Sequence, residues 1–139
     1  MVFESAGSGE IFLLARALFG LVLAFTGLNH LLDPEGMIGY SKAKGVPAAE
    51  FLVPATGIQL IAGGVAIAIG AFPVVAAGAI AVFLLVATPT MHDFWAVPEE
   101  QRQSEMTSFL KNATLLGGAL AFLALGSVEW PYAVGIGLF

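Results

Sequence analysis

Four apolar segments, separated by short breaks, constrain the fold of this chain more than any other feature of its sequence. They cover about residues 10–32, 49–70, 74–95 and 106–126 of the 139 residues. A helix that crosses the hydrocarbon core of a bilayer needs roughly 20 mainly apolar residues, and each segment reaches that length. The sequence therefore predicts an all-α integral membrane four-helix bundle, formed as a single domain over residues 1–139.

The composition supports lipid as the solvent of these segments. Hydrophobic residues make up 58% of the chain and charged residues only 11%, and the mean hydropathy is +0.92. A soluble domain carries about 25% charged residues, so the apolar side chains are too many for a protein core alone. The net charge of −5 lies mostly outside the apolar segments, which would suit a halophilic source and disfavours nucleic acid as a partner.

The chain contains no cysteine. This absence excludes thiol–disulfide chemistry, iron–sulfur clusters held by the chain and covalently attached c-type haem. A redox role would therefore need a cofactor or partner that binds without a covalent bond.

Basic residues predict the orientation of the segments. Lys42, Lys44, Arg102 and Lys111 lie in or next to the two breaks on one side, whereas the other side has only Arg16. Short loops rich in Lys and Arg stay in the cytoplasm. We therefore expect a multi-pass protein of the cell membrane with both termini outside. The first ten residues lack the basic region of a cleaved signal peptide, so we expect the first segment to be retained.

Small and polar residues recur on one face of each segment. At the helical repeat of 3.6 residues, the predicted faces are Arg16, Gly20, Leu23, Gly27 and His30; Gln59, Gly63, Ala66 and Gly70; Gly78, Ala81, Leu85, Thr88 and His92; and Ala113, Gly117 and Ala121 with Asn112 beside them. Small residues mark places where membrane helices approach closely. We expect these faces to point into the bundle.

A weak internal repeat divides the segments into two pairs. The first and third segments share Thr-x-x-x-His, at Thr26–His30 and Thr88–His92, and the second and fourth share a "GG" motif. This pattern indicates two helical hairpins in parallel orientation. It also places the only two histidines at the same end of the bundle, where they could line one cavity mouth.

These motifs together resemble the DoxX family of small four-helix membrane proteins. The matching residues run from Arg16 and Gly20 through "FTGLNHLLDPEG" (25–36), Tyr40, Gly45 and Pro47, then to His92 and "KNATLLGG" (111–118), so the resemblance covers nearly the whole chain. The resemblance implies a four-helix fold. It also suggests a function, because the name-giving members of the DoxX family are linked to a thiosulfate:quinone oxidoreductase, and more distant relatives act as membrane chaperones or cargo receptors.

Seven polar residues are candidates for binding a ligand such as a quinone: Arg16, His30, Tyr40, Gln59, His92, Asp93 and Asn112. Imidazole titrates near neutral pH, so the histidines could give protons to a quinone head group. The alternative for each histidine is to cap the carbonyl end of its helix. The alternatives for Arg16 are to reach the membrane surface or to pair with Glu10 or Glu129. Two histidines could also hold haem, or zinc together with Asp93, but their place at the bilayer edge disfavours both; no metal is expected.

Three functions remain open from the sequence. The first is a membrane component of a quinone-linked oxidoreductase system, with a redox partner. The second is a non-catalytic assembly factor or scaffold that binds another membrane protein or a second copy of itself. A small-solute transporter is the weakest, because four short spans would need to oligomerise to form a path. The sequence has no hydrolase or kinase motif, so whether the chain is an enzyme stays open.

Overall fold

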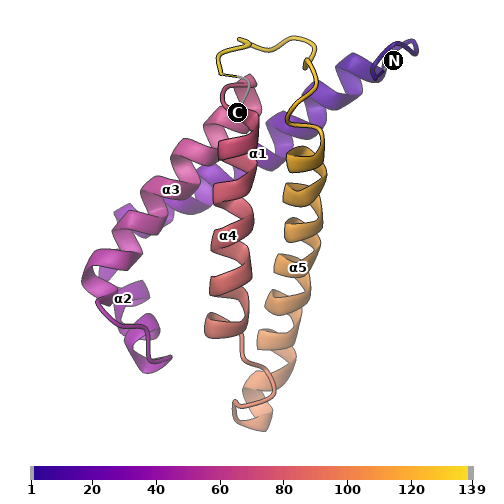
Figure 1. Ribbon diagram of the computed structural model, residues 1–139. Coiled ribbons are helices and arrows are strands. Elements are labelled where there is room, and N and C mark those ends of the chain that lie inside the picture. Colours follow the sequence, from indigo (N-terminus) through magenta and orange to yellow (C-terminus); the bar gives the residue numbers. More distant parts are fainter. Residues whose placement is uncertain (1, 138–139) are drawn as a thin grey trace.

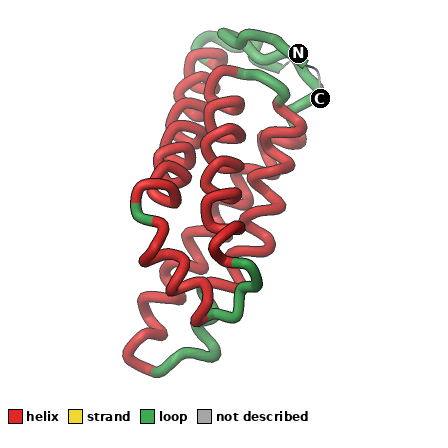
Figure 2. Tube along the Cα trace, turned by 90° about the vertical axis from the view of Figure 1, so that its left-hand side faces the viewer, coloured by secondary structure: helices red, strands yellow, loops and turns green. Residues whose placement is uncertain are grey.

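The computed structural model describes residues 2–137. Within them the chain forms five helices and no strand: α1 (Ser8–Leu32), α2 (Pro34–Ala43), α3 (Ala49–Ile69), α4 (Pro73–Met91) and α5 (Glu99–Ala124) (Figure 1). The prediction of an all-α fold is confirmed for this part of the chain. Both ends of the described chain lie at the same end of the molecule (Figures 1 and 2).

Three of the predicted spans match helices closely. Among the described residues, α1, α3 and α4 are long and apolar enough to cross a membrane. Helix α4 ends at Met91, four residues before the predicted end, and His92 leaves the helical conformation with φ −126°. Pro89 lacks the amide hydrogen that would continue the hydrogen-bond ladder, which weakens the helix at this point.

Helix α5 differs from the predicted fourth span. It begins at Glu99 rather than near residue 106, and by length and composition it does not qualify as a span among the described residues. The prediction treated 96–105 as a charged loop. Pro98 instead precedes the helix, and Glu99 and Glu100 occupy its first turn, where carboxylates interact favourably with the helix dipole.

Helix α2 was not predicted at all, because residues 33–50 were interpreted as a connecting loop. Pro34 opens the helix at its first position, which suits a residue without an amide hydrogen. Gly36 and Gly39 lie inside the helix and lower its intrinsic helix propensity. For this reason the composition of the segment did not predict a helix. This short helix carries Tyr40, whose hydroxyl contacts Glu105 of α5.

The four long helices pack mainly as two pairs, α1 with α3 and α4 with α5. This agrees with the two predicted hairpins. Helices α1 and α3 cross at glycines: a Cβ atom on Gly20 would lie 2.2 Å from the Gly64 carbonyl oxygen, and one on Gly27 would lie 2.5 Å from that of Gly57. The absence of side chains lets the two backbones touch.

The residues predicted to face the interior are buried on α1, only partly so on α4, and exposed on α5. All five residues predicted for the inner face of α1 are buried. On α4, Ala81 and Thr88 are buried but Leu85 is 57% exposed, so that assignment was wrong. On α5 the small residues Ala113, Gly117 and Ala121 are all exposed. The helix turns Ala119 and Phe122 into the core instead, because Phe122 packs in the aromatic cluster with Phe12 and Trp130.

The segment after α5 closes the end of the bundle where the termini lie. The Val134 amide donates a 2.9 Å hydrogen bond to the Ile69 carbonyl, and the Phe72 amide donates one of 2.8 Å to Ile136. Trp130 is only 6% exposed and meets the Phe12 ring edge to face, with ring centroids 5.1 Å apart. Trp130 is therefore part of the core, whereas Tyr132 is exposed.

Candidate functional site

A cavity lies at the opposite end of the molecule, between the two helix pairs. Its volume is about 720 Å³, and all five helices contribute to its lining. Most of the lining is apolar, with a limited number of polar side chains. Small-molecule sites typically have volumes of about 300–1,000 Å³ and the same mixture of an apolar wall and a few polar groups.

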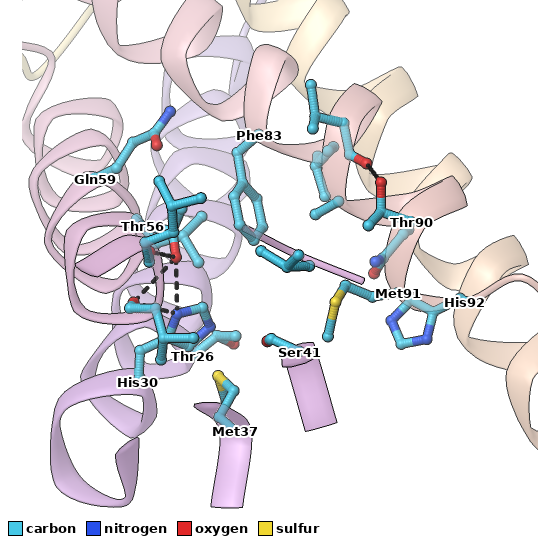
Figure 3. A pocket seen from close by; sticks show the side chains of 18 of the residues that line it. Thr26, His30, Met37, Ser41, Thr56, Gln59, Phe83, Thr90, Met91 and His92 are labelled. Carbon is cyan, nitrogen blue, oxygen red and sulfur yellow. Dashed lines mark hydrogen bonds between the residues drawn. The ribbon is translucent and has the colours of Figure 1, made fainter. Parts of the chain in front are cut away.

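His30 is the buried polar residue of the α1 wall (Figure 3). Its side chain points across to α3, where Nδ1 lies 3.1 Å from the Val53 carbonyl oxygen and 3.2 Å from Thr56 Oγ1. A carbonyl oxygen can only accept a hydrogen bond, so Nδ1 carries the hydrogen. His30 therefore does not cap the end of its own helix, and the capping interpretation was wrong for this residue. Gly57 makes room for it, because a Cβ there would lie 2.6 Å from His30 Cβ.

Gln59 lies on the same wall and joins α3 to α4. Its Nε2 donates a 2.8 Å hydrogen bond to the Ala79 carbonyl, and the side chain lines the cavity. Since the Ala79 oxygen is an acceptor, the amide nitrogen must face it. The bond fixes the orientation of the amide group.

His92 lies on the opposite side of the cavity, just after α4 (Figure 3). Its Nδ1 is 3.4 Å from Glu105 Oε2, close enough for an ion pair when the ring is protonated. Both atoms are buried, and neither has a hydrogen-bond partner within the described residues. Lys111 and Asn112 of α5 line the same side.

A cluster of charged residues connects α2 to α4 and α5 at the cavity mouth. The Tyr40 hydroxyl lies 2.8 Å from Glu105 Oε1 and 3.1 Å from the Met91 carbonyl oxygen, and Lys44 Nζ lies 2.5 Å from Asp93 Oδ1. The hydrogen bond from Lys44 holds the pKa of Asp93 below its usual value, and the same bond raises the pKa of Lys44. Burial, followed by the contact with Glu105, raises the pKa of Tyr40.

Comparison with known families identifies the chain. The sequence model of the DoxX family matches residues 11–93, more than half of the chain, from the start of α1 to the residues after α4. The chain belongs to the DoxX family. Comparisons with curated proteins and with solved structures found no match. Helix α5, including the "KNATLLGG" motif, lies outside the matched residues.

This DoxX protein is a membrane protein. Besides the family match, three of the described helices are long and apolar enough to cross a bilayer. Their outer faces expose large apolar side chains, including Leu18 at 59%, Phe25 at 63% and Phe51 at 70%. Exposed apolar surface of this extent needs a lipid or protein partner.

Five of the seven predicted site residues of the DoxX protein line this cavity: His30, Tyr40, Gln59, His92 and Asn112. Both histidines thus lie at the same cavity. Asp93 lies beside this cavity, in its ion pair with Lys44. Whether these residues bind a ligand stays a prediction.

Arg16 does not belong to this site. It lies near the other end of α1, is fully buried, and donates hydrogen bonds of 2.7 and 2.9 Å to the carbonyls of Pro131 and Tyr132. Its guanidinium carbon lies 5.3 Å from the Phe12 ring centroid and 5.5 Å from that of Trp130. Arg16 was expected as an alternative to reach the membrane surface or to pair with Glu10 or Glu129. Both alternatives were wrong, because the side chain is fully buried and its hydrogen bonds go to backbone carbonyls. It fastens the C-terminal segment to α1.

The sequence did not indicate Lys44, Thr56 or Glu105 as parts of the site. Glu105 was placed in a loop, yet α5 extends back to Glu99. A helix beginning there would have placed Glu105 on the same face as Asn112, seven residues on. Lys44 lies in a loop that has no periodicity, so no sequence pattern could have assigned it.

Proposed function

We propose that this DoxX protein crosses the cell membrane four times, with α5 as the fourth span and both termini outside. Both described ends lie together in Figure 1, as an even number of spans requires. Lys42, Lys44 and Arg102 belong to the opposite end, which fits the cytoplasmic side. Helix α5 has 26 residues, enough to cross a bilayer.

Single cysteines test this topology cleanly, because the chain has none of its own. The exposed positions Ala43 and Ser127 lie at opposite ends. In intact cells a membrane-impermeant maleimide should label Ser127→Cys and spare Ala43→Cys until the cells are opened. The reverse pattern would invert the proposed orientation. Labelling of both in intact cells would contradict three crossings by α3, α4 and α5, and with them α5 as the fourth span.

We further propose that the protein is a membrane component of a quinone-linked oxidoreductase system. The observation that carries this proposal is the cavity, which has a mainly apolar wall with one histidine on each side. A quinone has a flat ring with polar oxygens and an apolar tail, so it matches such a lining. Imidazole groups can exchange protons near neutral pH, which quinone chemistry requires. The electrons would come from a redox partner.

The test is to purify the protein from its native membranes in mild detergent and extract it with organic solvent. We expect about one quinone per protein chain, and we expect His92→Ala to reduce that amount. Arg102→Ala is the matched control, since Arg102 is exposed and does not line the cavity. Extracts without quinone, together with no binding of added quinone, would reject the proposal.

A scaffold or assembly factor is the second candidate. It is favoured by the exposed small residues Ala113, Gly117 and Ala121 on one face of α5. A helix of another membrane protein, or of a second copy of this chain, could pack closely on this face. Copurification of one membrane protein in fixed ratio, lost in Gly117→Leu, would favour this function over the first.

A further inference from the structure

The polar side chains of the α1 and α3 wall offer mainly hydrogen-bond acceptors to a ligand. The His30 ring uses its Nδ1 hydrogen for Val53 and Thr56, which leaves the lone pair of Nε2 in the neutral ring. The Gln59 amide gives one of its two Nε2 hydrogens to the Ala79 carbonyl, and its Oε1 can accept a hydrogen bond from a ligand. His30 Nε2 and Gln59 Oε1 are therefore both acceptors.

The hydroxyl groups around them follow the same pattern. Thr56 Oγ1 lies 2.8 Å from the Leu52 carbonyl oxygen, and Thr26 Oγ1 lies 3.0 Å from that of Val22. Thr90 Oγ1, on α4, lies 2.7 Å from the Val86 carbonyl oxygen. Each hydroxyl has a single hydrogen, and a backbone carbonyl takes it in each case, so only oxygen lone pairs remain for a ligand.

The other side of the cavity is different. Lys111 and Asn112 of α5 line it, and both can donate hydrogen bonds. Ser41 and Tyr40 contribute hydroxyls from α2, and the Tyr40 hydroxyl is already engaged with Glu105. A ligand that donates toward α1 and α3 and accepts from α5 therefore suits both sides of the cavity.

We propose that the cavity selects a ligand whose ring carries hydroxyl groups, and that it binds a quinol more tightly than the corresponding quinone. A quinol hydroxyl can donate to His30 Nε2 or Gln59 Oε1 and still accept from α5. A quinone carbonyl has no hydrogen to donate, and its lone pairs would face those of the wall. This inference rests on the proposed function, and it adds which redox form the site prefers.

The test compares the binding of a decyl-substituted benzoquinone, its benzoquinol and the dimethyl ether of that benzoquinol to the wild-type protein without oxygen. One net hydrogen bond changes a Kd by about twofold to tenfold, so we expect the quinol to bind about tenfold more tightly than the quinone. The dimethyl ether keeps the ring and the acceptor oxygens but has no donor, and it should bind as weakly as the quinone.

Gln59→Leu removes one acceptor and should reduce the preference for the quinol severalfold, while the Kd of the quinone changes little. Gln103→Leu is the matched control, because Gln103 is exposed and outside the cavity lining. The ratio of the Kd of the quinone to the Kd of the quinol, measured on the wild-type protein, is sufficient to test the inference without any variant. Equal Kd values, or tighter binding of the quinone, would overturn it and leave the proposed function in place. Binding of neither form would overturn both.

Discussion

The space between the two helix pairs is filled with side chains at one end of the molecule and contains a cavity at the other. At the end with the termini, Phe12, Phe122 and Trp130 pack in the core between the helix pairs, and the buried Arg16 lies against Phe12 and Trp130. At the other end the pairs enclose a cavity of about 720 Å³. Contacts that join the two pairs at this end include the α2 hydroxyl of Tyr40 on Glu105 and the ion pair of Lys44 with Asp93.

The charged groups differ between the ends as well. Arg16 is held by backbone carbonyls and aromatic rings, none of which is an acidic or basic group. Lys44 is held by Asp93, a carboxylate that gains a proton in acid. The contacts of Arg16 with these groups therefore do not depend on the charge of a partner, whereas the ion pair of Lys44 is lost in strong acid. The following predictions test this contrast, from the largest expected effect to the smallest.

Arg16→Met should cause the largest loss of stability. It removes two charge-assisted hydrogen bonds and leaves the carbonyls of Pro131 and Tyr132 without their donors, which we expect to cost about 3 kcal/mol of unfolding free energy. The measurement is equilibrium unfolding in mixed micelles, followed by circular dichroism. Arg102→Met, at an exposed position, is the control and should change little. A loss no greater than that of the control would refute the role of Arg16 as the fastening of the C-terminal segment.

Gly20→Ala should cause the next largest loss of stability, about 2 kcal/mol of unfolding free energy. The new methyl group would meet the Gly64 carbonyl oxygen, so α1 and α3 must move apart. Gly117→Ala on α5 is the matched control, since a Cβ there meets nothing within 4 Å. Alanine favours helix over glycine, so the control should keep or slightly raise the stability. If both variants behaved alike, the close crossing of α1 and α3 would be wrong.

Asp93→Asn should have a smaller effect that depends on pH. The folded-state pKa of Asp93 lies below its ordinary value of 3.8, so its ion pair stabilises the fold above that pH. This contribution is lost as the pH falls through the folded-state pKa. We therefore expect Asp93→Asn to be less stable than wild type at pH 6 and to converge with it in strong acid, in the same unfolding assay. A difference that persisted unchanged into acid would argue against the ion pair.

Lys44 sets the upper pH limit of the stabilisation by this ion pair, as Asp93 sets the lower one. Its pKa is raised in the folded protein, so its contribution is present below its ordinary value of 10.5 and is lost as the pH rises through the folded-state pKa. The stability difference between wild type and Asp93→Asn should thus also shrink at high pH.

Tyr40→Phe should have the smallest effect, at most about 0.5 kcal/mol, because Tyr40 is partly exposed and its hydrogen bonds compete with water. Thermal unfolding should detect little change. Removal of the hydroxyl should nevertheless loosen α2, and faster hydrogen exchange of the α2 amides would show this. Unchanged exchange would mean that α2 does not depend on Tyr40 for its position.

The sequence predicted the long apolar helices well, because the length of an apolar run is a local property. It also predicted the buried face of α1, where glycines, Arg16 and His30 recur at helical spacing. The same reasoning failed on α5. Small residues allow close approach but do not require it, and the large apolar surface of Phe122 turned the other face inward.

The candidate site was predicted in part for a similar reason. His30 and His92 were placed together because both end an apolar helix at the same side. The sequence placed Arg16 at the correct end but did not reveal its partners, since these are backbone carbonyls of a segment more than 100 residues later in the chain, and a carbonyl carries no sequence signal. Lys44 and Glu105 meet only through tertiary contacts that involve α2, a helix that the sequence did not reveal.

Filling the cavity tests its proposed role most directly. Ala87 lines the cavity on α4, and Ala113 is exposed on α5 outside it, so Ala87→Trp and Ala113→Trp add the same bulk inside and outside the cavity. The measurement is the Kd of the decyl-substituted benzoquinol for each folded variant. If the cavity is the binding site, Ala87→Trp should weaken binding about tenfold or more, and Ala113→Trp should bind like wild type. Equal binding by both variants would show that the ligand does not occupy this cavity.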